Sequence, residues 1–278
     1  MSLKHFRGNV YYNSDGIGAI RNDVTAVAWE RELLKTLTSL FDAEPFKTSR
    51  AVLGAINRRN KRMIITPFPK TATPNADESA KDPTAGTPAG QTQLSCSTNQ
   101  PIAGAALGTG GGSAAAVRFT AQDHLGGTLP GDPPDEVLFH EMVHGLRDIR
   151  GEGRCSAVAN PGFLPKSFQS VYDNFEEFAA ILITNVYRSE CKRPGLRADH
   201  AAVSHPLRYP LTNAKDYYIV WKKHIDKMCR EMLNMCIHIA NLRSIDWNPI
   251  KFSVSDILNL DTIEDLNKYE AVLNQNDW

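Results

Sequence analysis

The residues best suited to chemistry are two histidines four positions apart, His140 and His144, in the segment His-Glu-Met-Val-His. On a helix this spacing puts both imidazoles on one face, about one turn apart. Two nitrogens so placed can bind one zinc ion at about 2.0–2.1 Å. Glu141 follows the first histidine and can act as general base on a water molecule while zinc polarises a scissile carbonyl. The pattern therefore predicts metal-assisted peptide hydrolysis, with Glu141 as the catalytic residue.

The residues around this short motif favour the same interpretation. Met142 and Val143 lie inside the motif, and further apolar residues flank it on both sides. A helix this apolar is mostly buried, and buried histidines and glutamates cost desolvation free energy unless something binds them. The alternative is a pair of satisfied core histidines beside a surface glutamate.

A catalytic zinc site needs a third protein ligand and an open position for water. The sixth residue after His144 is Arg150, a permanent cation that cannot bind zinc, so this position does not supply the ligand. Two adjacent glutamates, Glu176 and Glu177, lie about thirty residues downstream in an apolar stretch. Adjacent helical residues point about 100° apart, so only one of the two should face the metal.

The elements that must position these residues are predicted from periodicity and from helix-start signals. Prolines and acids at 130–135 mark the start of the motif helix, predicted over 135–147. A strand is expected directly upstream, at 114–120. The other expected elements are a helix over 24–41, a strand over 62–66, and helices over 175–187, 214–240 and 262–273.

Residues 70–113 differ in composition, being rich in Thr, Pro, Ala, Gly and Ser, and are expected to form a flexible loop or insertion. The glycine run at 108–113 lacks the Lys-Ser/Thr of a phosphate-binding loop. We expect a single α+β domain over 1–278. It should combine a small sheet, the motif helix and the glutamate helix with a mainly helical C-terminal half.

The composition excludes several classes of protein. Lys plus Arg and Asp plus Glu both total 31, so no net charge attracts nucleic acid. No segment approaches the roughly 18 apolar residues of a membrane span, and no apolar stretch typical of a signal peptide follows Met1. The five cysteines are odd in number and form no C-x-x-C pair, which favours reduced thiols. We therefore expect neither a nucleic-acid nor a membrane partner.

Three segments carry a family resemblance: HEMVHGLRDIRG at 140–151, YDNFEEFAAILITNVYRSE at 172–190 and RADH at 197–200. They resemble the NleD-like family of bacterial effector zinc peptidases, closely over 130–205 and loosely elsewhere. The resemblance implies a gluzincin-like, zincin-type fold with zinc as cofactor, His140 and His144 as ligands and Glu141 as base. It also implies a type III secreted effector without a classical signal peptide, acting in the host cytosol on a protein substrate such as a MAP kinase. We expect a monomer.

Related motifs give conflicting assignments for the third ligand. Glu-Glu-Phe-Ala resembles the E-x-F-A segment of anthrax lethal factor and of a family of zinc aminopeptidases, which points to Glu176. Clostridial neurotoxins share F-E-E-L, which points to Glu177. Glu176 is the predicted third ligand and Glu177 the alternative.

Other side chains have weaker claims to a role. A donor to the oxyanion could come from Tyr172, Tyr187, Arg208 or Tyr209, although structural roles are favoured for each. His200 and His205 could bind a second metal ion, although roles at the surface or beside the metal ligands are favoured. The rival functions are a toxin peptidase with a different protein target and a non-catalytic zinc-binding interaction module. An intact Glu141 argues against the module, because a structural site does not need a base.

Overall fold

The computed structural model describes residues 3–15, 18–42, 47–70, 80–81, 111–112, 114–154, 156, 158, 172, 174–198, 206–242 and 245–260. Its strands are β1 (Lys4–Arg7), β2 (Val10–Tyr12), β3 (Met63–Thr66), β4 (Ala80–Lys81) and β5 (Ala115–Arg118). Its α-helices are α1 (Ala26–Phe41), α2 (Lys47–Asn57), α3 (Pro134–Arg150), α4 (Phe175–Glu190), α5 (Ala214–Glu231), α6 (Leu233–Ala240) and α7 (Ile250–Ile257). Two short 3₁₀ helices, η1 (Arg21–Asp23) and η2 (Ala121–His124), complete the described elements. The α+β class expected from the sequence is confirmed.

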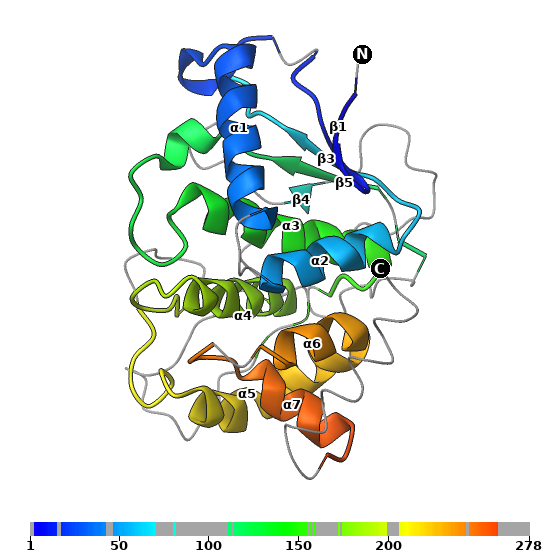
Figure 1. Ribbon diagram of the computed structural model, residues 1–278, viewed down its shortest axis with the longest axis vertical. Helices are drawn as coiled ribbons and strands as arrows, with labels where there is room; N and C mark the ends of the chain where they lie inside the picture. The colour runs from blue at the N-terminus through cyan, green and yellow to red at the C-terminus, as the bar shows by residue number, and fades with distance from the viewer. Residues whose placement is uncertain are drawn as a thin grey trace.

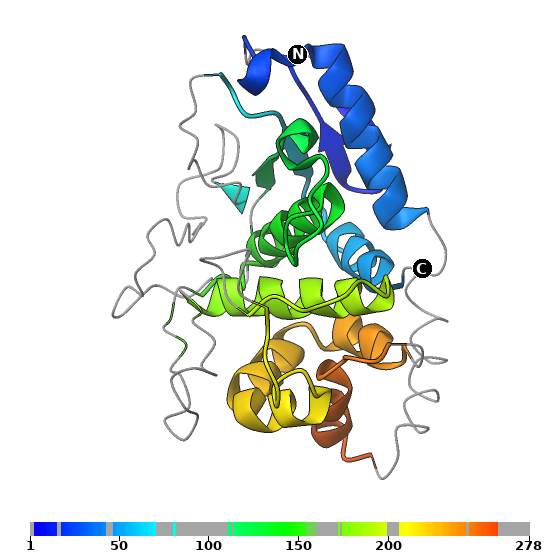
Figure 2. The same cartoon turned by 90° about the vertical axis from the view of Figure 1, so that its left-hand side faces the viewer.

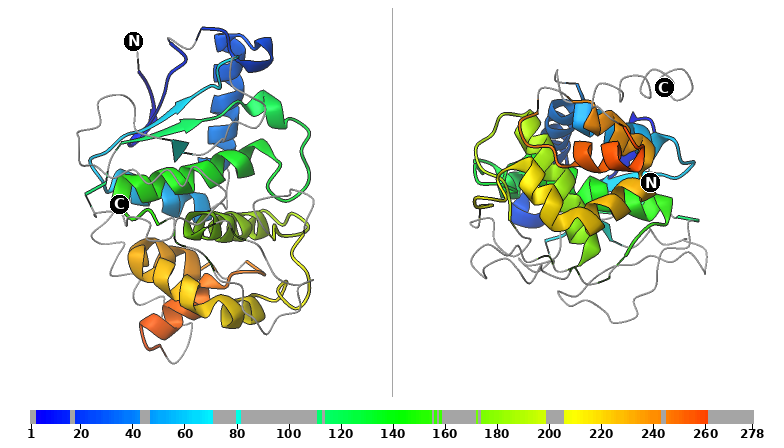
Figure 3. Two further views of the ribbon diagram at one scale, coloured as in Figure 1. Left: turned by 180° about the vertical axis from the view of Figure 1, so that it is seen from behind. Right: turned by 90° about the horizontal axis from the view of Figure 1, so that it is seen from below.

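The described elements are stacked in layers along the long axis of the molecule. The sheet and α1 lie at one end, with α2 and α3 beneath them (Figure 1). Helix α4 crosses the middle, and α5, α6 and α7 lie at the other end (Figure 2). The view from behind shows the same order from sheet to C-terminal helices (Figure 3). Helix α4 therefore connects the sheet-containing part with the helical part.

The sheet is mixed, with strand order β1-β2-β3-β5-β4. Its three central strands, β2, β3 and β5, are parallel, and β1 and β4 pair antiparallel at the two edges. Burial alternates along the central strands, which is the pattern of a sheet with one face in the core. The buried side chains are Val10, Tyr12, Met63, Ile65, Ala115 and Val117.

Helix α3 lies directly on this buried face. A Cβ atom added at Gly145 would lie 2.6 Å from Cε of Met63 and 3.4 Å from Cβ of Ala115. Glycine therefore permits the helix backbone to approach β3 and β5 closely. Because Gly145 follows His144 directly, this contact also fixes how far the histidine pair lies from the sheet.

Five predicted elements agree with the structure to within three residues at each end: α1, β3, β5, α3 and α4. The single helix expected over 214–240 is wrong, because it is two helices that meet at Met232, with φ −124° and ψ 41°. An apolar stripe continues across this break, so periodicity alone cannot detect it. The helix expected over 262–273 lies outside the described residues. Most of the predicted loop at 70–113 also lies outside the described residues. The described part of it includes β4, which pairs with β5.

Two further properties concern the described residues only. None of the described helices has both the length and the apolar character needed to span a bilayer. The three described cysteines, Cys191, Cys229 and Cys236, are free thiols.

Candidate metal centre

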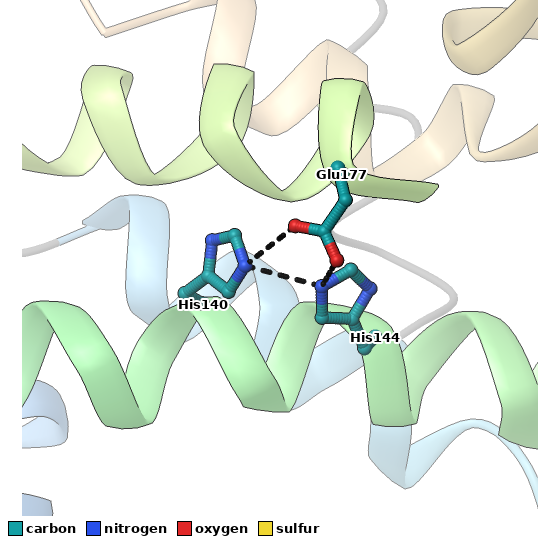
Figure 4. A group of neighbouring side chains, drawn as sticks. All are labelled: His140, His144 and Glu177. Carbon is teal, nitrogen blue, oxygen red and sulfur yellow. Dashed lines mark hydrogen bonds and ion pairs between the residues drawn. The ribbon is translucent and has the colours of Figure 1, made fainter. Parts of the chain in front are cut away.

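Three potential metal ligands meet where α3 and α4 pack side by side. His140 and His144 project from α3, and Glu177 projects toward them from α4 (Figure 4). Nε2 of His140 lies 3.1 Å from Nε2 of His144 and 3.2 Å from Oε2 of Glu177. Nε2 of His144 lies 3.4 Å from Oε1 of Glu177. One ligand atom from each residue lies within 4.8 Å of the others, so the three could hold one metal ion.

The two helices have well-defined ends that fix these side chains in place. Helix α3 starts with Pro134 and ends at Arg150, and the following residue, Gly151, has a left-handed φ of 67° that suits glycine at a helix C-terminus. The histidines therefore lie in the interior of a stable helix. Asn174 caps α4 and accepts hydrogen bonds from the backbone N–H groups of Glu176 and Glu177. Glu177 consequently stands in the first turn of α4, where the chain direction is set by the cap.

His140, His144 and Glu141 are buried, and Glu177 is half-buried. His140 is 3% exposed, His144 is 8% and Glu141 is 6% exposed, while the side chain of Glu177 retains 13%. Glu141 follows His140 on α3, and its charge contributes to raising the pKa of His144. A carboxylate that is not one of the three clustered donors thus lies near them, as a general base requires.

The environment drives the pKa values of the two histidines apart in the protein without a metal ion. Burial lowers the pKa of His140, the positive charge of His144 adds to this, and the hydrogen bond with Glu177 opposes it, so the pKa falls to about 3. Burial also disfavours protonated His144, but the carboxylates of Glu177 and Glu141 outweigh burial and raise its pKa to about 9. Burial raises the pKa of Glu177, but the histidines outweigh it and hold this pKa well below 4.5. His144 and Glu177 therefore form an ion pair beside a neutral His140.

The prediction that Glu176 lies with the histidines is wrong, and the alternative, Glu177, takes that position. Glu176 points instead toward Arg147 of α3. Nε of Arg147 donates to Oε2 of Glu176 at 2.6 Å and Nη2 donates to Oε1 at 3.0 Å. The physical reason is that a fully buried guanidinium needs a carboxylate partner, and Glu176 supplies it.

The role of Arg147 was not predicted from the sequence, although a signal existed. It lies three residues after His144 in an apolar helix, so its charge needs a buried partner on a neighbouring element. That requirement would have assigned one of the two adjacent glutamates to the arginine and left the other for the histidines.

The candidates for an oxyanion donor either contact other side chains or are exposed. The hydroxyl of Tyr172 lies 2.5 Å from that of Tyr217 on α5, and the hydroxyl of Tyr187 donates to Asp135 at the start of α3. Tyr209 is 77% exposed, and Arg208 is also exposed. His200 and His205, considered above for a second metal ion, lie outside the described residues.

Comparison of the chain with protein-family models, with curated proteins and with solved structures gives no match. The function is therefore inferred from the residues of the site and their chemistry.

Proposed function

We propose that this chain is a zinc-dependent endopeptidase with a zincin-like fold, in which His140, His144 and Glu177 bind the metal ion. The observation that carries the proposal is the convergence of two imidazoles and one carboxylate beside the separate carboxylate of Glu141. Two histidines and a glutamate are a common ligand set of catalytic zinc, and three protein ligands leave a position for water. Imidazole and carboxylate donors without thiolates are consistent with a catalytic rather than a cysteine-rich structural zinc site.

Zinc bound by these residues would supply Lewis acidity, polarising the scissile carbonyl and making water more acidic. Glu141 takes a proton from the attacking water as the water oxygen bonds to the carbonyl carbon. Glu141 then delivers this proton to the amide nitrogen as the C–N bond breaks. The products are a new carboxylate and a new amine. Glu177, with His140 and His144, would hold the metal ion.

The binding of zinc should be strongly pH-dependent, because it must displace the proton that His144 carries. With a pKa of about 9, His144 is protonated at neutral pH, whereas His140, at about 3, is already neutral. The zinc affinity should therefore rise about tenfold per pH unit from pH 7 toward pH 9 and level off above it. Titration against a chelator of known pH dependence measures this slope. A flat profile between pH 7 and 9 would contradict the ion pair of His144 with Glu177.

The enzymatic proposal is tested with purified protein and candidate substrates. The resemblance to NleD-like effectors suggests a secreted effector that acts on host signalling proteins, so MAP kinases and unrelated host proteins should be incubated in parallel. We expect cleavage within a kinase activation loop, mapped by mass spectrometry. A chelator should abolish cleavage, and added zinc should restore it.

The outcomes separate the proposal from its rivals. Intact kinases alongside cleavage of another protein would support a peptidase with a different target. Zinc bound without cleavage of any protein would support a non-catalytic interaction module. Cleavage that is unaffected by the chelator would overturn the metal-dependent mechanism.

A further inference from the structure

We infer that the buried pair of Arg147 and Glu176 positions Glu177 for the metal ion. This inference rests on the proposed zinc site and concerns the residues that aim its third ligand. Arg147 and Glu176 are positioning residues, because they bind each other and neither belongs to the three clustered donors.

The pair is held on several sides. Arg147 is fully buried and binds Glu176 through two nitrogens, at 2.6 and 3.0 Å. A two-pronged bond of this kind fixes direction as well as distance. Oε1 of Glu176 also accepts from the backbone N–H of Arg154 at 2.5 Å, and Nη2 of Arg147 reaches Oε2 of Glu231 on α5 at 3.1 Å. The carboxylate of Glu176 therefore has little freedom to turn.

Contacts on successive residues hold the whole first turn of α4. Oδ1 of Asn174 accepts from the N–H of Glu176 at 2.9 Å and from that of Glu177 at 3.1 Å. The guanidinium of Arg147 lies 5.3 Å from the ring centroid of Phe175. Each residue from the cap to Glu176 is thus fixed by a contact of its own, and Glu177 is the next along the helix.

This anchoring determines which glutamate faces the histidines. His144 and Arg147 are three residues apart and so lie on the same side of α3. Adjacent residues of α4 point about 100° apart, so binding Glu176 to Arg147 turns Glu177 toward the histidines. Without the pair, the first turn would lose the contact that distinguishes the two carboxylates, and Glu176 could compete for the metal. The pair should therefore affect metal affinity in addition to stability.

A second buried ion pair between the same helices provides a matched control. Nη1 of Arg188 donates to Oε1 of Glu136 at 2.6 Å, and the two side chains are 1% and 0% exposed. Arg188 lies eleven residues beyond Glu177, near the other end of α4. Breaking this pair removes a comparable link between α3 and α4 without touching the first turn of α4.

The experiment compares Glu176→Gln with Glu136→Gln in the full chain. The melting temperature of the metal-free protein, the zinc affinity and the visible spectrum of the Co²⁺-loaded protein are measured. Both variants should melt roughly 5–15 °C lower, because each leaves a buried arginine short of a partner. Only Glu176→Gln should weaken zinc binding, by about 10–100-fold, and alter the Co²⁺ spectrum. Arg147→Lys, which keeps the charge but lacks the fork, should show a smaller loss of zinc affinity.

An equal loss of zinc affinity in Glu176→Gln and Glu136→Gln would overturn the inference, as would a Glu176→Gln variant with wild-type affinity and spectrum. If Glu176→Gln does not fold, Arg147→Lys decides the question by the same criteria. A wild-type protein that does not bind zinc would refute the proposed function as well. If the wild-type protein binds zinc and the Glu176→Gln variant binds it equally well, this inference alone is refuted.

Discussion

Glu141→Gln should slow peptide hydrolysis by about 10²–10⁴-fold and leave zinc bound. Glutamine has nearly the size and shape of glutamate, so the interior of α3 is preserved, but its amide cannot accept the proton of the attacking water. Metal content and cleavage rate are measured on the same preparation, so that loss of the base is distinguished from loss of the metal ion.

Glu141→Asp is a useful companion variant because it keeps the carboxylate and withdraws it by one methylene. It should retain more activity than Glu141→Gln. Cleavage by Glu141→Gln at the wild-type rate would show that another group moves the proton.

The second large effect is expected for Glu177→Gln, which replaces a charged ligand by a neutral one. The zinc affinity should fall by more than the 10–100-fold that is typical when a residue hydrogen-bonded to a metal ligand is changed. Cleavage should be lost with the metal ion. Competition with a chromophoric chelator measures the affinity, and the melting temperature of the metal-free variant shows whether the fold persists.

Glu176→Gln is the matched control for Glu177→Gln, because it makes the same chemical change one residue earlier. A greater loss of zinc in Glu176→Gln than in Glu177→Gln would restore Glu176 as the ligand.

The motif helix could be predicted from the sequence because its signals are local. Prolines and acids mark its start, and the spacing of His140 and His144 places both on one face. Strand β1 was missed because Lys4–Arg7 is short and mostly exposed, so it has no apolar alternation to detect. The break at Met232 was missed because the apolar positions continue through it.

Local sequence could not show which glutamate lies with the histidines, because Glu176 and Glu177 are adjacent and chemically identical. What distinguishes them is a contact with Arg147, 29 residues away in the chain and across the packed face of α3 and α4. The periodicity of a helix does not reveal which distant residues its side chains contact. The motif thus predicted the histidine pair, which the structure confirms as neighbours, but the glutamate beside them is Glu177 and not the predicted Glu176.

The bond between Arg147 and Glu176 also suggests a composite sequence signature for comparing other chains. It combines H-E-x-x-H-x-x-R with a later N-x-E-E, both of which this chain contains at 140–147 and 174–177. In a chain with both halves, we expect the arginine to bind the first glutamate and the second glutamate to face the histidines. In a chain with an apolar residue at the arginine position, the first glutamate has lost this partner and the assignment must be made afresh. The choice between two adjacent glutamates then depends on whether the motif helix carries this arginine.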